Sequence, residues 1–174
     1  LTEAGCVDSP ALARLVEADW GDVEILLVDL PPGTGDVQLS LIQRARPAGA
    51  IVVSNPKDLA LIDARRAVDL FNKMSVPVLG LIENMATYVC PHCGAASPPF
   101  GSGGAEEAAQ EMHIPCLGRL PLSVAIREAT DAGKQPAAGA GPGAQAIAAL
   151  SAHSLTGLQG EYVCSRPVQG PCQS

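Results

Sequence analysis

The residues best suited to chemistry are Cys90 and Cys93, which form the single Cys-x-x-Cys pair of the chain, within Tyr-Val-Cys-Pro-His-Cys-Gly at residues 88–94. Two thiolates at this spacing can bind one metal atom, because a tight turn brings both sulfurs to the same side. A closed metal site usually takes four such ligands. The remaining cysteines stand singly, at Cys6, Cys116, Cys164 and Cys172. The sequence therefore predicts half of a metal site, completed by another molecule.

From the residues alone, the pair fits more than one kind of site. Cys-Pro-x-Cys-Gly turns are common in zinc knuckles, although zinc would need further ligands and His92 lies inside the turn, poorly placed to reach the same metal. A redox dithiol usually begins a helix, and Pro98-Pro99 soon after the pair argues against a long helix. Cys116 falls in a predicted strand, where a role in the core is favoured over a third metal ligand.

A second chemical signal lies between residues 23 and 36. The apolar run VEILLVDL ends at Asp29 and continues into Pro-Pro-Gly-Thr-Gly-Asp. P-loop NTPases hold Mg²⁺ through a carboxylate at such a strand end, and a following glycine lets a backbone N–H approach a phosphate. A plain turn, in which Pro and Gly set the dihedrals, explains Asp29 equally well. For Asp36 we favour the cap of a following helix.

The elements that position these residues follow from hydrophobic patterning. Near-continuous apolar runs at 23–30, 49–54, 76–82 and 116–120 predict strands buried on both faces. Between and around them, helical spacing predicts helices at 12–18, between Asp36 and Pro47, from Pro56 with Asn55 as its cap, and at 105–112, 124–129 and 142–151. Strands separated by helices predict an α/β fold with a mostly parallel sheet flanked by helices. Ligands of such sheets bind beyond the carboxyl ends of the strands.

Size and composition narrow the class of protein. The 174 residues suit one domain, and a net charge of −7 without a Lys/Arg cluster argues against nucleic acid as a partner. No apolar run reaches the length of a membrane helix, and the sparse cysteines favour a reducing, cytoplasmic compartment. We predict a domain over residues 1–152 and a disordered tail over 153–174. Because the chain begins Leu1-Thr2 rather than with Met, its natural start is expected upstream.

Three separated motifs, in order, resemble those of the Mrp/ApbC family of iron–sulfur cluster carrier ATPases, which are related to the MinD and ParA P-loop proteins. They are DLPPGTGD at 29–36, LIENMATYVCPHCG at 81–94 and IREATDAGKQP at 126–136. The resemblance runs from about Trp20 to Pro136 and implies a P-loop NTPase-like fold. The family's phosphate-binding loop, ending Gly-Lys-Ser/Thr, is absent upstream of the first motif, and the loop at 101–104 has no lysine to replace it. We therefore expect an N-terminally incomplete domain, which counts against ATP hydrolysis by this chain alone.

The resemblance also implies roles for single residues around ATP and Mg²⁺. Asp29 matches the catalytic acidic residue that orients Mg²⁺ and its waters. Pro32 and Gly33 match the switch that senses the γ-phosphate. Asn84 matches the residue that reads the nucleotide base, and Pro121 matches a loop that packs near the base.

For the cysteines, the resemblance implies that Cys90 and Cys93, with the same pair from a second subunit, hold a bridging [4Fe–4S] cluster. The implied function is an ATP-linked carrier that transfers the cluster to apo iron–sulfur proteins. The alternative is a non-catalytic zinc-binding or dimerisation module that has lost nucleotide binding. A MinD-like role at membranes is disfavoured, because the C-terminal region lacks a basic amphipathic helix.

Overall fold

The computed structural model describes residues 14, 17–30, 35–90, 92–93, 95–139 and 141–159. In chain order, the elements are α2 (Asp36–Ala45), β1 (Ala50–Ser54), α3 (Asp58–Lys73), β2 (Val78–Glu83), β3 (Tyr88–Val89), β4 (Ala96–Ser97), α4 (Gly104–Glu111), β5 (Cys116–Arg119), α5 (Val124–Asp131), the 3₁₀ turn η1 (Pro136–Ala138) and α6 (Pro142–Gln159).

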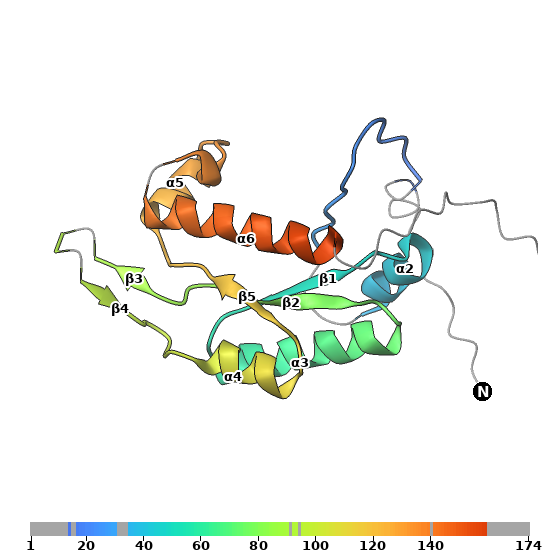
Figure 1. The fold of residues 1–174 in the computed structure, drawn as a ribbon, viewed down its shortest axis with the longest axis horizontal. Helices are drawn as coiled ribbons and strands as arrows, with labels where there is room; N and C mark the ends of the chain where they lie inside the picture. Colours follow the sequence, from blue (N-terminus) through green and yellow to red (C-terminus); the bar gives the residue numbers. More distant parts are fainter. Residues whose placement is uncertain are drawn as a thin grey trace, which may run out of the picture.

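The centre of the fold is a three-stranded parallel sheet in the order β1-β2-β5. Val52 of β1 pairs with Leu81 of β2, which pairs in turn with Cys116 of β5. Helices α3 and α4 connect the strands and cover one face, while α6 covers the other (Figure 1). This arrangement confirms the predicted α/β class, a parallel sheet flanked by helices.

The core forms where β2, the middle strand, meets α3 and α4. Leu81 is completely buried, and Leu61 and Val68 pack around it from α3. The buried positions of α3 recur at helical spacing, which is why this amphipathic segment folds onto the sheet. On the opposite face, Gly118 of β5 lets α6 approach closely, since a Cβ there would lie 2.8 Å from Cδ2 of Leu150.

Two helix starts differ from the sequence prediction. Helix α3 begins at Asp58, because the Asn55 side chain accepts a hydrogen bond from the Lys57 N–H at 3.1 Å and forms a turn before the helix. In α2 the N-cap residue is Gly35, so the predicted capping role of Asp36 is wrong and Asp36 is the first helical residue.

The strand predicted at residues 23–30 does not form. The segment has no regular secondary structure, and most of its apolar side chains are exposed, Leu27 by 83% and Val23 by 52%, while Leu30 at its end is half-buried against the core. A strand needs a neighbour to pair its N–H and C=O groups, and among the described residues the sheet contains only β1, β2 and β5. Asp29 is consequently not at the end of a strand.

The C-terminal helix is longer than the predicted 142–151, because α6 continues to Gln159. Residues 153–159, which we assigned to a disordered tail, are therefore helical. The rest of that tail, 160–174, lies outside the described residues, as does most of the helix predicted at 12–18.

Candidate functional site

The carboxyl ends of the three parallel strands meet at one edge of the sheet. The Asn84 N–H donates to the Ser54 carbonyl at 2.7 Å, which joins the ends of β2 and β1. On the other side, the Leu120 N–H donates to the Glu83 carbonyl at 2.8 Å, which joins β2 to the end of β5. Asn84 therefore lies centrally at the edge where open parallel sheets bind ligands.

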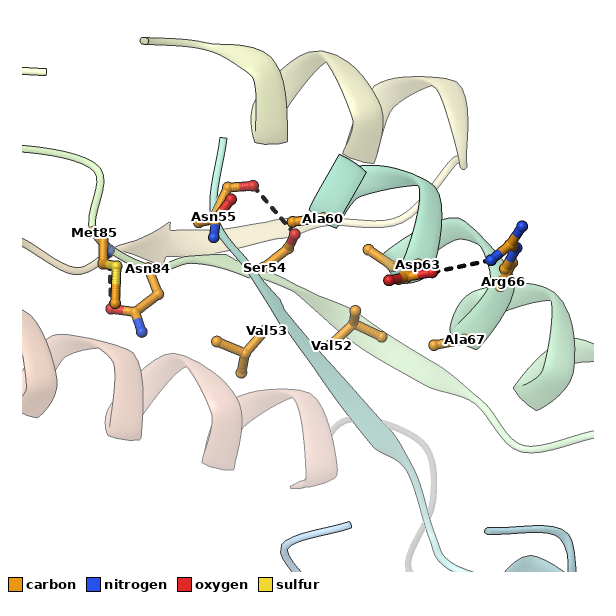
Figure 2. A pocket seen from close by; sticks show the side chains of 11 residues that line it. Val52, Val53, Ser54, Asn55, Ala60, Asp63, Arg66, Ala67, Asn84 and Met85 are labelled. Atoms are coloured by element: carbon orange, nitrogen blue, oxygen red, sulfur yellow. Dashed lines mark hydrogen bonds and ion pairs between the residues drawn. The ribbon is translucent and has the colours of Figure 1, made fainter. Parts of the chain in front are cut away.

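A cavity of about 460 Å³ opens beside Asn84, between the end of β1 and helix α3 (Figure 2). Most of the side chains that form its floor on β1 and its wall on α3 are small and apolar. Polar groups come from Asn55 and Asn84 at the strand ends and from Asp63 and Arg66 of α3, which form an ion pair at 3.1 Å. An open cavity of this size, with both polar and apolar lining, has room for a small organic ligand.

The amide of Asn84 is held in a defined orientation. Its Oδ1 accepts a hydrogen bond from the Met85 N–H at 2.9 Å, and Met85 adopts a left-handed backbone conformation with φ of 58°. This turn leaves the side-chain NH₂ group of Asn84 as a donor for a ligand in the cavity.

An ion pair between the buried Glu83 and the exposed Arg119 lies next to Asn84, and the sequence motifs did not indicate it. Glu83 is fully buried, and the Nε of Arg119 lies 3.0 Å from its Oε2. The two residues face each other in register on β2 and β5. Because a buried unpaired carboxylate is costly, this pair fixes the ends of both strands. The available signal was a charged residue closing each of two apolar runs, VLGLIE and CLGR.

The other predicted nucleotide-binding residues do not gather at this cavity. Pro121 is half-buried just after β5 but does not line the cavity. Asp29 is exposed in an irregular segment and does not line it either. Pro32 and Gly33 lie outside the described residues.

The cysteine pair lies at the tip of a short hairpin made by β3 and β4. Tyr88 pairs with Ser97 and Val89 with Ala96, and the Cys90 N–H donates to the Ala95 carbonyl at 3.0 Å. In Figure 1 the hairpin projects away from the helical layers. The two cysteines in this position are open to a second molecule.

The turn favours the thiolate form of Cys90. The backbone N–H groups of His92 and Cys93 lower the pKa of the Cys90 thiol, and an interaction with the Cys93 side chain lowers it further. Cys90 is half-buried and Cys93 is exposed. Since a metal binds the thiolate, this turn is suited to one.

Within the part of the chain that the structure describes, the hairpin offers only these two ligands. No group of three or more His, Cys, Asp or Glu side chains lies close enough to hold a metal ion there, so His92 does not complete a set with the cysteines. Cys116 is exposed on β5, which corrects its predicted place in the core. Partial burial of its sulfur raises the pKa of that thiol.

Comparison with known proteins decides the family. The family described as ParA, NUBPL iron-transfer P-loop NTPase matches residues 4–153. This chain belongs to that family. The finding confirms the family indicated by the three motifs.

Individual relatives agree with the assignment. The chain is 47% identical over 134 residues to an iron–sulfur cluster carrier protein of Pseudomonas fragi. The matched region covers 76% of this chain and 47% of the relative. The chain is also 45% identical over 140 residues to the mouse iron–sulfur cluster transfer protein NUBPL, covering 80% of this chain and 44% of that protein. The chain thus spans less than half the length of these relatives.

Among solved structures, the chain is similar to a nucleotide-binding protein from Archaeoglobus fulgidus in complex with ADP, in which cobalt was found. The TM-score is 0.62 at 35% identity, over 71% of this chain and 53% of that protein. The shared fold is that of a P-loop NTPase. In the described part of this chain, no helix has the length and apolar character to span a membrane.

Proposed function

We propose that this chain is the cluster-binding part of an iron–sulfur cluster carrier. The observation that carries the proposal is the exposed hairpin whose tip presents Cys90 and Cys93 without a third ligand among the described residues. Two such tips, one from each of two subunits, supply the four thiolates that a [4Fe–4S] cluster takes. The cluster is then a cargo held at an interface and passed to apo iron–sulfur proteins in the cytoplasm.

The chemistry of the tip suits a cargo site. The N–H groups that lower the pKa of Cys90 favour the thiolate form, which is the form that binds iron. Exposure of Cys93 leaves a path for an acceptor thiol to replace it. A site closed within one chain would be harder to unload.

The cavity at Asn84 is the proposed position of the nucleotide base. Support comes from its place at the carboxyl ends of β1 and β2, from the oriented Asn84 amide and from the ADP bound by the similar Archaeoglobus fulgidus protein. Asp29 is the proposed Mg²⁺-orienting residue, Pro32 and Gly33 the γ-phosphate sensor, and Pro121 a neighbour of the base.

A zinc-binding or dimerisation module is the second candidate. The same observation favours it, because two exposed thiolates per chain can also complete a Cys₄ zinc site across a dimer. In that case the cavity at Asn84 would serve no nucleotide.

Metal analysis separates the two candidates. The chain is purified without oxygen, incubated with iron and sulfide, and its bound iron, sulfide and zinc are measured beside a Cys90→Ala/Cys93→Ala variant. The carrier predicts equal iron and sulfide, lost in the variant. Stoichiometric zinc with no sulfide would identify the module instead. Binding of Mg-ATP and its turnover, measured on the same samples, test the proposed nucleotide role of the cavity.

A further inference from the structure

We propose that Asn55 is a second base-recognition residue of the cavity, which donates its side-chain NH₂ group to a ring nitrogen of a nucleobase bound beside Asn84. This role rests on the nucleotide binding proposed above for the cavity and adds a specificity-determining residue to it. The observations that carry it are the hydrogen bonds already made by the two amides and the side chains that form the cavity wall.

Asn55 lies directly after β1, and its amide is held in one orientation at the cavity. Its Oδ1 accepts a hydrogen bond from the Lys57 N–H at 3.1 Å, which closes a turn before α3. Lys57 is held in turn, because its Nζ lies 4.4 Å from the centroid of the Phe100 ring. The oxygen of the Asn55 amide is therefore turned to the backbone, which leaves its NH₂ group as a donor.

Asn84 is arranged in the same way after β2. Its Oδ1 accepts from the Met85 N–H at 2.9 Å, and its backbone N–H donates to the Ser54 carbonyl at 2.7 Å. Figure 2 shows Asn55 and Asn84 at the same end of the cavity. Within the described residues, neither side-chain NH₂ group donates to a protein atom, so two oriented donors are available to one ligand.

The wall on α3 favours a ligand with a flat apolar face. Ala60, Ala64 and Ala67 share one side of this helix and line the cavity, and such short side chains leave room for a ring. The Asp63 carboxylate on the same helix is already paired with Arg66 at 3.1 Å. A flat ring with acceptors on its edge therefore fits best, and the ring nitrogens of a purine are such acceptors.

Two donors on separate strand ends fix a base more closely than one donor does. With Asn84 alone, a base could still turn about its single hydrogen bond. A second bond from Asn55 sets its orientation. A base that lacks the matching acceptor leaves the Asn55 NH₂ group unpaired, which is the physical basis of discrimination by such sites.

The test uses adenosine, because it carries no phosphate whose charge would respond to a new carboxylate. Asn55→Asp keeps the oxygen that accepts from the Lys57 N–H but removes the NH₂ donor. We expect Asn55→Asp to bind adenosine about three- to tenfold more weakly, with an unchanged thermal unfolding midpoint. Asn84→Asp, which makes the same change at the other amide, should weaken binding by a similar factor. Titrations followed by ¹⁵N–¹H NMR should also shift both side-chain NH₂ signals of the wild type.

A set of adenosine analogues shows whether the lost bond is a direct one. In 1-deaza-, 3-deaza- and 7-deazaadenosine, a C–H group replaces one ring nitrogen. We expect one of the three to bind the wild type and Asn55→Asp equally well, because the acceptor of Asn55 is then missing in both cases. A different analogue should behave in this way with Asn84→Asp. If Asn55→Asp weakens all three analogues as much as adenosine, Asn55 makes no direct bond to the base and the inference is overturned.

A matched variant separates recognition from a general effect of added charge. Asn72→Asp makes the same change at an exposed position of α3 that does not line the cavity, and it should leave adenosine binding unchanged. Unchanged binding in Asn55→Asp, or equal weakening in Asn72→Asp, overturns the role of Asn55 while the nucleotide role of the cavity stands. Failure of the wild-type chain to bind either adenosine or Mg-ADP removes both, and it leaves the cysteine site untouched.

Discussion

Strand β2 and the β3–β4 hairpin follow each other in the chain but are held in opposite ways. β2 has a strand on either side and helices on both faces, and its Leu81 is completely buried. The hairpin has two residue pairs, and its Val89 is 42% exposed. The scaffold is therefore fixed by packing, whereas the cysteines are placed by a few local contacts. Such a division suits a protein that must release what it binds.

The largest expected effect is on the free energy of unfolding when one side chain is truncated in each region. Leu81→Ala leaves a cavity in the core and should lower the free energy of unfolding by about 2–5 kcal/mol. Val89→Ala removes a partly exposed side chain and should cost about 0.5 kcal/mol or less. Urea unfolding followed by circular dichroism measures both. Equal losses would mean that the hairpin is part of the packed core.

A smaller effect is expected from the ion pair at the end of β2. Arg119→Met leaves the buried Glu83 carboxylate without its partner and should cost about 1–3 kcal/mol, discounted for the partial exposure of Arg119. The matched control is Arg65→Met, which removes an exposed ion pair with Glu111 and should cost less than about 1 kcal/mol. Thermal unfolding of the two variants gives the comparison. A larger loss in Arg65→Met would refute the supporting role of Glu83 and Arg119.

The smallest expected effect is a difference in alkylation rate between the thiols of Cys90 and Cys116. Cys116 is exposed and Cys90 only half-buried, so access alone favours alkylation of Cys116. However, the pKa of Cys90 is lowered by neighbouring N–H groups, and that of Cys116 is raised by partial burial of its sulfur. The thiolate is the reactive form, so Cys90 should react faster with iodoacetamide at pH 7, and the difference should shrink as pH rises above both pKa values. Peptide mass spectrometry reads both rates, and faster labelling of Cys116 at pH 7 would contradict the thiolate assignment.

The sequence prediction holds where a segment's own pattern is sufficient, and it departs from the structure where a partner elsewhere in the chain is needed. The runs at 49–54 and 76–82 became β1 and β2 because each has a paired neighbour among the described residues. The run at 23–30 is just as apolar, yet its Leu27 is 83% exposed, because strand formation needs a partner that composition does not reveal.

The candidate site shows the same limit. The cysteine pair was visible as a motif, since both thiols lie within one turn. The pairing of Glu83 with Arg119 depends on strand register, and the contact of Lys57 with Phe100 depends on how a loop returns to α3. Neither follows from spacing along the chain.

Cys90 and Cys93 are proposed to form half of a cluster site shared by two chains. Native mass spectrometry of the anaerobically reconstituted chain tests it most directly. We expect a species of two chains with four iron and four sulfide ions, which is absent from the Cys90→Ala/Cys93→Ala variant. A single chain holding a complete cluster, or a cluster retained by that variant, would contradict it.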